Sequence, residues 1–259
     1  TSILSAAVVT GAQAIHPGFG FLSENSAFAT MCEEMNIRFI GPSSTIIDLM
    51  GNKANARKTM IAAGVPVTPG SEGYISSYEE AVVQAEKIGY PVILKAAAGG
   101  GGKGMRKVYQ ENGLEAAFSQ AKAEAKAAFG DDSMYLEKII TPARHIEVQI
   151  LGDSFGNVVH LGERDCSLQR NHQKVLEESP STFISEETRK AMGDVAIRAA
   201  KHVGYTNAGT IEFLVDTEQR FYFMEMNTRI QVEHPVTEMA TGIDIVKEQL
   251  RIASGEPLS

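Results

Sequence analysis

Hydrophobic residues recur every three or four positions in some segments of the chain and alternate with polar residues in others, which predicts helices and strands respectively. Phe28, Met31, Cys32 and Met35, for example, have helical spacing between two short apolar runs. Short connections between such elements are typical of a parallel α/β unit. The predicted helices are 3–9, 24–35, 44–63, 78–88, 113–129, 186–203 and 243–253. The predicted strands are 12–15, 38–40, 91–95, 105–109, 134–139, 144–151, 157–161, 210–216 and 221–227.

Glycine and proline mark the boundaries between groups of these elements. Gly41-Pro42 ends the first α/β unit, Gly64 ends the polar helix that follows, and Pro69-Gly70 precedes a compact unit of helices and strands. The last third of the chain is rich in strands at first and mixed afterwards. We therefore expect four segments, with the bounds 1–42, 43–67, 68–139 and 140–259.

Charge and composition exclude several classes of function. The chain has 259 residues, of which 24 are Lys or Arg and 32 are Asp or Glu, for a net charge of −8. Such a field repels nucleic acid and anionic lipid, so neither is an expected partner. Two isolated cysteines favour a reducing cytoplasm over a disulfide scaffold. No apolar run approaches the ~18 residues of a membrane span. Because the chain opens at Thr1 without a starting Met or a signal-peptide pattern, we expect it to be a piece of a longer protein.

A glycine-rich loop connects the predicted strands 91–95 and 105–109. It contains G-x-G-x-x-G, but a dinucleotide-binding turn opens a helix, and here a strand follows. A Walker A motif also fails, because Gly104 follows Lys103 where Ser or Thr is needed. The loop is therefore predicted to be a flap whose backbone N–H groups approach phosphate oxygens, with Lys95 and Lys103 adding positive charge. A flexible loop tip is the alternative.

The last two predicted strands form a hairpin that brings carboxylates together. If Asp216 pairs with Phe221, Glu212 lies directly opposite Glu225, and Asn227 shares their face. Two carboxylates about 5 Å apart repel by roughly 3 kcal/mol at an effective dielectric of ~20. A divalent cation removes this repulsion, and Mg²⁺ or Mn²⁺ bound together with nucleotide phosphates is expected. A solvated hairpin face in a different register is the alternative.

The segment 227–235, which follows the hairpin, carries an Arg, a Gln, a Glu and a His. Because Pro235 disfavours helical geometry in the residue before it, a helix is not expected there. The planar guanidinium of Arg229 matches a carboxylate or bicarbonate, and Glu233 is a candidate base. A surface loop with charges for solubility is the alternative.

A second polar cluster, 163–174, follows a predicted strand, and a solvated turn is one interpretation of it. It is locally basic, and His172 and Lys174 are candidates for neutralising the charge of phosphate or bicarbonate. His145, like two other isolated histidines, has no metal-ligand spacing, so its sequence context alone favours a structural or solvent-facing role.

Four motifs are specific enough to compare with known families. They are His16-Pro17-Gly18-Phe19-Gly20-Phe21-Leu22-Ser23-Glu24-Asn25, the glycine loop 99–105, Glu163-Arg164-Asp165-Cys166-Ser167, and the segment 225–238, which reads EMNTRIQVEHPVTE. Together they closely resemble biotin carboxylase, the ATP-grasp component of acetyl-CoA carboxylase. The resemblance runs along the whole chain in order. Ala98 and Lys103 depart from the residues that relatives often have, and both keep the size and charge of the loop.

This resemblance implies a mixed α/β (α+β) ATP-grasp fold that is truncated at both ends. Residues 1–42 would be the remnant of a Rossmann-like N-terminal domain, and residues 43–67 a helical linker. Residues 68–139 would be the flap (B) domain, and residues 140–259 would begin the C-terminal ATP-grasp domain.

The resemblance also implies a role for individual residues, each taken from the matching motif position. The positions that match ATP contacts are Lys53, Lys95, Gly101, Gly102, Glu137, Lys138, Ile140, His145, Gln169, His172 and Leu214. Those that match metal ligands are Glu212, Glu225 and Asn227. Those that match the bicarbonate site are Lys174, Arg229, Gln231, Val232 and Glu233. Of these, Arg229, Glu233 and Lys174 match catalytic positions, and Glu233 matches the base that deprotonates bicarbonate.

The activity implied by the resemblance is ATP-dependent carboxylation of biotin with bicarbonate, by way of carboxyphosphate. The chain has no biotin-acceptor motif, so biotin would arrive on a biotin carboxyl carrier protein, and carboxyltransferase subunits would complete an acetyl-CoA carboxylase. A homodimer is expected for the full-length protein. Pyruvate, propionyl-CoA and methylcrotonyl-CoA carboxylases share the motifs and remain alternatives. So does a nucleotide-binding module without turnover.

Overall fold

The computed structural model describes residues 2–71, 73–97, 104–171 and 173–258. Gly101 and Gly102 of the glycine loop, together with Lys103 and His172, lie outside the described residues. Helices and strands are both present among the described residues, so the predicted mixed α/β class is confirmed.

The N-terminal region is a small parallel α/β unit. Its elements are α1 (Ser2–Thr10), β1 (Ala14–Ile15), α2 (Ser26–Glu34) and β2 (Arg38–Phe39). The two strands pair in parallel, as the short connections predicted. Phe28, Cys32 and Phe39 are buried together in its core. The side chain of Asn25 caps α2 by accepting a hydrogen bond of 2.7 Å from the backbone N–H of Phe28.

The predicted single helix 44–63 is wrong, because the structure contains two helices there. These are α3 (Ser44–Gly51) and α4 (Lys53–Ala62). Asn52 between them has an extended backbone, with φ −90° and ψ 110°, and its side chain accepts a hydrogen bond from the N–H of Asn55. Such a cap satisfies a free N–H group of the second helix and turns its axis away from the first. The break places Lys53 at the start of α4, beside the candidate site.

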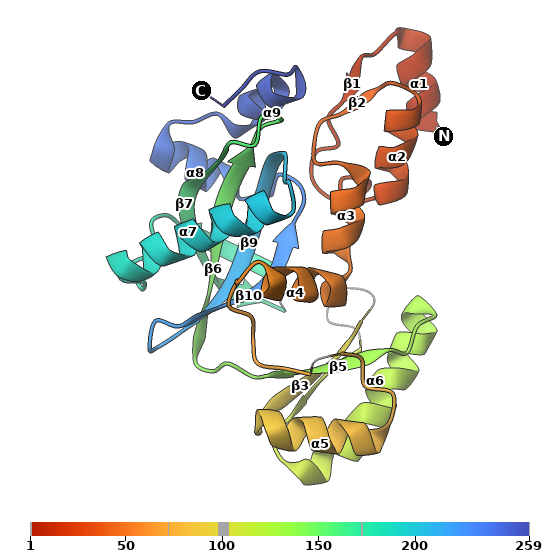
Figure 1. The fold of residues 1–259 in the computed structure, drawn as a ribbon, viewed down its shortest axis with the longest axis vertical. Coiled ribbons are helices and arrows are strands. Elements are labelled where there is room, and N and C mark those ends of the chain that lie inside the picture. Colours follow the sequence, from red (N-terminus) through yellow and green to blue (C-terminus); the bar gives the residue numbers. More distant parts are fainter. Residues whose placement is uncertain (1, 72, 98–103, 172, 259) are drawn as a thin grey trace.

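A separate unit, called the flap unit here, follows the linker helices (Figure 1). It comprises α5 (Tyr78–Ile88), β3 (Val92–Ala96), β4 (Met105–Val108), the short 3-10 helix Glu111–Gly113, α6 (Leu114–Phe129) and β5 (Met134–Lys138). Its three strands form an antiparallel sheet in the order β4-β3-β5. Val92 and Leu94 of β3 are buried against the two helices. Because strand side chains alternate, Lys95 lies on the opposite face.

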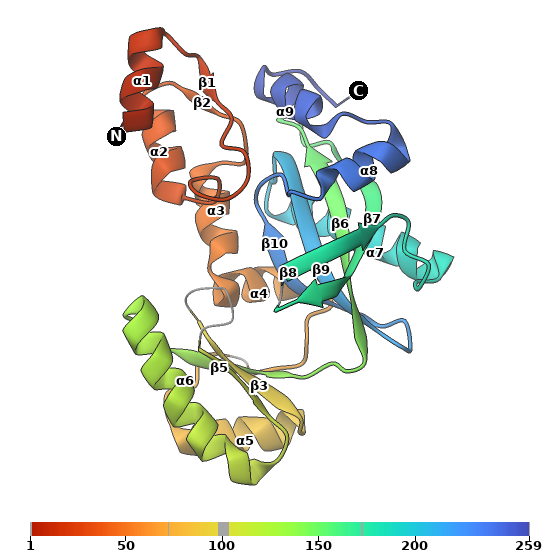
Figure 2. The same ribbon diagram turned by 180° about the vertical axis from the view of Figure 1, so that it is seen from behind.

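The largest sheet has five antiparallel strands in the order β10-β9-β6-β7-β8. They are β6 (Ala143–Gly152), β7 (Val158–Arg170), β8 (Gln173–Glu178), β9 (Asn207–Asp216) and β10 (Phe221–Asn227). The helix α7 (Glu186–His202) packs on one face. Figure 2 shows the opposite side, with α8 (His234–Thr241) and α9 (Ile245–Ala253) at one end of the sheet.

Two interpretations of the sequence in this region are wrong. The cluster 163–174 is not a turn: its residues through Arg170 continue β7, and β8 begins at Gln173. The buried polar residues of this strand have polar partners, since Arg164 bonds to Glu147, and Glu163 and Asp165 accept hydrogen bonds from Ser181. A helix also begins at His234, where none was expected, with Pro235 in its first turn. Proline is tolerated at that position, since the N–H that it lacks would have no partner within the helix.

Tyr205 fills a space at the end of the large sheet that two glycines leave open. Its side chain is buried, and its hydroxyl donates a hydrogen bond of 2.9 Å to the carbonyl of Ala208. A Cβ atom on Gly209 would lie 2.5 Å from that hydroxyl oxygen, and one on Gly152 would meet the backbone of Tyr205. The close approach therefore requires glycine at both positions.

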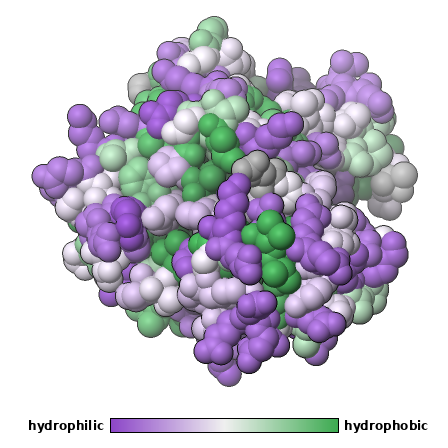
Figure 3. All heavy atoms as spheres, turned by 60° about the horizontal axis from the view of Figure 1, so that its bottom comes forward, coloured by the Kyte–Doolittle hydropathy of each residue, from purple (hydrophilic) through white to green (hydrophobic). Residues whose placement is uncertain are grey.

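The surface agrees with the composition. Hydrophilic residues cover most of the face that is seen from the flap-unit end, and hydrophobic residues gather there in small patches (Figure 3). None of the helices that the structure describes combines the length and the apolar character needed to cross a membrane.

Candidate active site

A row of charged residues crosses four strands of the large sheet. Arg164 of β7 pairs with Glu147 of β6, Glu147 pairs with Glu212 of β9, and Glu212 pairs with Glu225 of β10. Paired residues in neighbouring strands project from the same face of a sheet. The face opposite α7 therefore carries three carboxylates and one guanidinium in sequence. This row is the base of the candidate site.

The strand β6 has one apolar and one polar face. Ile146 and Val148 are buried in the core that contains α7 residues. His145, Glu147 and Gln149 alternate with them and point to the other side. Glu147 and Gln149 are fully buried, so they require polar partners. Sequence reasoning missed Glu147, although this alternation of polar residues in an otherwise apolar strand was a usable signal.

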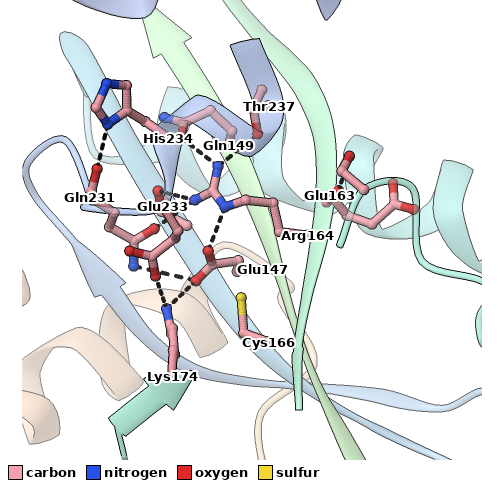
Figure 4. Close-up of polar contacts among 12 residues, drawn as sticks. Glu147, Gln149, Glu163, Arg164, Cys166, Lys174, Gln231, Glu233, His234 and Thr237 are labelled. Atoms are coloured by element: carbon pink, nitrogen blue, oxygen red, sulfur yellow. Dashed lines mark hydrogen bonds and ion pairs between the residues drawn. The ribbon is translucent and has the colours of Figure 1, made fainter. Parts of the chain in front are cut away.

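The ammonium group of Lys174 contacts three carboxylates that come from different elements. Its Nζ lies 2.9 Å from Oε1 of Glu212 and 2.7 Å from Oε1 of Glu233, and it also bonds to Oε2 of Glu147. Burial alone would lower the pKa of Lys174, but the charges of Glu212 and Glu147 outweigh it and raise the pKa. Lys174 is therefore a permanent cation at the centre of the site (Figure 4).

The same cation controls the ionisation of Glu233. Burial would raise the pKa of this carboxyl group, but the hydrogen bond and the charge of Lys174 lower it below its usual range. Glu233 is thus ionised at neutral pH and can accept a proton. The structure brings the side chains of Lys174 and Glu233 together. That both residues act on bicarbonate remains a prediction.

The hairpin β9–β10 places Glu225 opposite Glu212, but by a different route from the predicted one. Phe221 pairs with Val215 and not with Asp216, so the predicted register at the turn is wrong by one residue. A bulge at Met224 inserts one extra residue in β10, and beyond it Glu225 pairs with Glu212.

The third predicted metal ligand, Asn227, lies beside the pair formed by the other two, Glu212 and Glu225. Nδ2 of Asn227 donates a hydrogen bond of 2.8 Å to Oε1 of Glu212, and Nζ of Lys53 lies 3.3 Å from Oε2 of Glu225. Glu212 is buried, yet its pKa is lowered, because His145 and Lys174 outweigh the effect of burial. Two carboxylates and an amide carbonyl are hard oxygen donors, so these residues fit Mg²⁺ or Mn²⁺.

Arg164 connects side chains of several elements at the base of the site. It is completely buried, and its guanidinium donates hydrogen bonds to Glu147 at 2.7 Å, Gln149 at 2.9 Å, Thr237 at 2.7 Å and Gln231 at 2.7 Å. A fifth contact, to Oγ1 of Thr210, measures 3.5 Å. Figure 4 shows the guanidinium between the β6 side chains and the segment that leads into α8.

Arg229 lies at the start of the segment that leads into α8, and its guanidinium bonds to other residues than Arg164 does. Nη2 donates to Oδ1 of Asn227 at 3.1 Å, and Nε donates to Oε2 of Glu24 at 3.0 Å. The backbone N–H of Thr228 donates to the second oxygen of Glu24. Glu24 belongs to a motif in the sequence but was given no role. Through it the N-terminal region of the chain contacts the site directly.

The residues predicted to contact ATP form a second group beside the charged row. Glu137 of β5 bonds to Nζ of Lys95 on β3 and lies 3.7 Å from Nη1 of Arg57 on α4. Lys138 instead donates to the carbonyls of Gly89 and Tyr90, at 2.8 and 2.7 Å. In the flap unit, Lys95 is therefore paired with a carboxylate, whereas Lys138 is bonded to backbone carbonyls.

His145, Gln169 and Leu214 extend this group along the large sheet. His145 pairs with Leu214 across β6 and β9. Its Nδ1 lies 2.7 Å from Nε2 of Gln169, and its Nε2 lies 2.9 Å from Oε2 of Glu212. Burial would lower the pKa of His145, but the contact with Glu212 raises it. This site-facing position was not predictable from the isolated histidine itself.

The structure thus brings most of the predicted residues together. Gln231 is buried, and its Nε2 donates to Glu212 at 3.1 Å and to Glu147 at 3.3 Å. Val232 beside it is exposed. Ile140, in the connection after β5, is half-buried.

The fold and the site define a class of protein. A small antiparallel flap unit lies next to a larger antiparallel sheet (Figure 2). Lys95 of the flap unit pairs with Glu137, and Lys53 of α4 pairs with Glu225 of the large sheet. This is the architecture of an ATP-grasp protein, in which a nucleotide binds between the two sheets.

Comparison with known proteins agrees and is more specific. The family described as carbamoyl-phosphate synthase L chain, ATP binding domain, matches residues 52–259, and the family described as biotin carboxylase, N-terminal domain, matches residues 1–47. The chain belongs to the biotin carboxylase family.

Similar proteins cover the whole chain. Biotin carboxylase 1 of Bacillus subtilis is 58% identical over 260 residues, which are 100% of this chain and 58% of that protein. The chloroplastic biotin carboxylase of Arabidopsis thaliana is 57% identical over 257 residues, which are 99% of this chain and 48% of that protein. The chain therefore spans about half of the length of these relatives.

A solved structure has the same fold. The biotin carboxylase of Campylobacter jejuni, in a complex named as β,γ-ATP, is 56% identical and superposes with a TM-score of 0.96, covering 100% of this chain and 58% of that one. The biotin carboxylase domain of Hydrogenobacter thermophilus 2-oxoglutarate carboxylase is 54% identical, with a TM-score of 0.94, and covers 99% of this chain and 57% of that one.

Proposed function

We propose that the protein containing this chain carboxylates biotin, with ATP and bicarbonate as the other substrates. The observation that carries the proposal is the contact of Lys174 with Glu233, next to the pair formed by Glu212 and Glu225. It places an ionised base and a fixed cation beside residues that suit a metal and phosphates. The family of the chain supports the same activity.

ATP is proposed to bind between the flap unit and the large sheet. Lys53 and Lys95 would neutralise phosphate charge, since each now pairs with a glutamate that a phosphate could replace. The backbone of Glu137 to Ile140 would read the adenine, and His145, Gln169 and Leu214 would form the opposite wall. Gly101, Gly102 and His172 complete the proposed set.

A divalent cation, Mg²⁺ or Mn²⁺, would be held by Glu212, Glu225 and Asn227. The donor set fits, because the pKa of Glu212 is lowered by its surroundings and its carboxylate lies opposite that of Glu225. When bound, such an ion neutralises charge that develops on the phosphates during transfer. The structure of the Hydrogenobacter thermophilus domain is named as a complex with MgADP and bicarbonate, which supports this assignment.

Bicarbonate is proposed to bind between Arg229 and Lys174, with Gln231 and the backbone of Val232 completing its contacts. Glu233 would accept the bicarbonate proton, and the resulting oxygen would attack the γ-phosphorus of ATP. The bond between that phosphorus and ADP breaks, giving carboxyphosphate and ADP. Carboxyphosphate then breaks down to CO₂ and phosphate. The phosphate takes the proton of the biotin ureido nitrogen, and that nitrogen captures CO₂.

We also propose the assembly in which this reaction takes place. Biotin would arrive on a biotin carboxyl carrier protein, and carboxyltransferase subunits would use the product in a cytoplasmic acetyl-CoA carboxylase. Relatives named as biotin carboxylase support this parent. The Hydrogenobacter thermophilus domain is named as a dimer, which supports a homodimer. The propionyl-CoA carboxylase alpha chain of Ruegeria pomeroyi is also 52% identical, so an acyl-CoA carboxylase of that kind is the alternative parent.

Phosphate release from ATP tests the activity. The intact protein should release phosphate faster when biotin is added in the presence of bicarbonate, and Glu233→Gln should abolish the increase while Mg-ATP still binds. Binding of Mg-ATP without any stimulated release would instead support a nucleotide-binding module without turnover.

A further inference from the structure

Arg164 belongs to one of the sequence motifs, but the proposed reaction gives it no task. It has no exposed surface, so it does not touch a substrate. Burying a guanidinium is costly unless its donors are satisfied, and four of its contacts measure between 2.7 and 2.9 Å. Because several partners hold the guanidinium in place, it in turn fixes the positions of the side chains that accept its hydrogen bonds.

The contacts of Arg164 lie on both sides of the proposed base. Gln231 precedes Glu233 by two residues and accepts from Nη2, whereas Thr237 follows it by four residues and accepts from Nη1. Arg164 therefore bonds to both flanks of the segment that carries Glu233, from the same sheet face as Glu147 (Figure 4).

The contact with Gln231 also determines which way its amide points. A guanidinium only donates, so it can accept no hydrogen bond from an NH₂ group, and Oε1 must face Arg164. Nε2 is then directed toward Glu147 and Glu212, at 3.3 and 3.1 Å. Both protons of Nε2 are thus donated to carboxylates, and the Gln231 side chain connects Arg164 to Glu147 and Glu212.

The contact between Arg164 and Glu147 determines how charge is distributed in the site. Glu147 is fully buried and accepts from Nε of Arg164 with one oxygen and from Lys174 with the other. Because Glu147 is shared between Arg164 and Lys174, more of the charge of Lys174 is available for Glu233 and a bound anion than if Lys174 alone bonded to Glu147. The charge of Arg164 also contributes to the low pKa of Glu233.

We propose that Arg164 is a positioning residue for bicarbonate: through Gln231, Thr237 and Glu147 it fixes the anion-binding end of the site. This inference rests on the proposed function. A lysine at this position would keep the charge but lose the planar set of donors, so it could not hold Gln231, Thr237 and Glu147 together.

The test compares two arginine-to-lysine variants in the intact protein. Arg164→Lys should raise the KM for bicarbonate at least tenfold and leave the KM for ATP within twofold. Arg189→Lys is the matched control, because Arg189 bonds at 2.8 Å to the buried Glu163, the residue next to Arg164 in β7, and lies outside the site. It should leave both constants unchanged. Equal rises in both constants, or no rise for bicarbonate in folded Arg164→Lys, would overturn the inference.

Two further measurements cover the remaining outcomes. If Arg164→Lys does not fold, Thr237→Val removes one acceptor of Arg164, and it should raise the bicarbonate KM severalfold with no change for ATP; an unchanged value would contradict the role. If the protein lacks bicarbonate-dependent turnover, the proposed function fails on its own. A crystal structure of Arg164→Lys, or of Thr237→Val if the lysine variant does not fold, then decides, because displaced Gln231 supports positioning and an unmoved Gln231 refutes it.

Discussion

Replacing Lys174 with methionine tests the electrostatic account of the site most severely. The substitution keeps most of the side-chain volume and removes the charge that contacts Glu147, Glu212 and Glu233. Those carboxylates would then lie close together with less compensation. Arg164 would still bond to one oxygen of Glu147, and no other cation among the described residues bonds to Glu233.

The size of the effect follows from the geometry. Carboxylate oxygens of Glu147 and Glu212 lie within 4.8 Å of one another, and the same holds for Glu147 and Glu233. At that separation and an effective dielectric of ~20, each pair repels by roughly 3.5 kcal/mol. Removing one partner of a buried ion pair costs about 3 to 5 kcal/mol, so we expect a loss of that order in the free energy of unfolding.

Urea unfolding at two pH values provides the assay. Without Lys174 the pKa of one carboxylate rises, so the native variant binds a proton as the pH falls from about 8 to about 5 and regains stability. The deficit relative to the wild type should therefore shrink at the lower pH. Lys138→Met is the control, because among the described residues Lys138 bonds only to backbone carbonyls, and its smaller deficit should not depend on pH.

Two results would refute this reasoning. One is a free energy of unfolding for Lys174→Met within about 1 kcal/mol of the wild type, which is the size expected for an exposed ion pair. The other is a deficit that is the same at both pH values.

Three other expectations can be checked separately. Glu225→Gln should weaken Mg²⁺-dependent nucleotide binding at least tenfold in a titration, whereas Glu218→Gln in the exposed turn should not, and equal affinities would contradict the proposed ligand set. Glu233→Gln should lower stability at pH 7, and since the pKa of Glu233 is lowered, this cost should disappear as the pH falls from about 4.3 through the folded pKa, as unfolding curves would show. Gly209→Ala should cost about 1 to 3 kcal/mol by crowding Tyr205, whereas Gly51→Ala, which meets nothing within 4 Å, should not; equal melting temperatures would exclude the crowding.

The sequence predicted elements well where periodicity alone decides them. The bounds expected for 78–88 are those of α5, and the helix expected at 186–203 ends within one residue of α7. Local rules failed where tertiary contacts prevail. Residues 163–170 are polar yet form a strand, because Arg164 and its neighbours are paired inside the sheet. Asn52 caps α4, and although Asn favours helix caps, the predicted helix 44–63 ran through it.

For the candidate site, too, the prediction succeeded where a local pattern decides and failed where contacts between distant residues decide. The opposition of Glu212 and Glu225 was predicted from alternation, but the register assumed at the turn was wrong, and the bulge at Met224 compensated for it. Glu147 and Arg164 were missed as site residues because their importance depends on contacts with Gln231 and Thr237, which lie between 67 and 84 residues further along the chain. Glu24 was missed for a similar reason, since its partner Arg229 is 205 residues away.

Transfer of label from radioactive bicarbonate to biotin is the most direct measurement of the central claim. With ATP and Mg²⁺ present, the intact protein should form acid-labile carboxybiotin, and Glu233→Gln should form none while still binding nucleotide. Label transfer that does not require ATP, or ATP binding with no label transfer by the unmodified protein, would contradict the account.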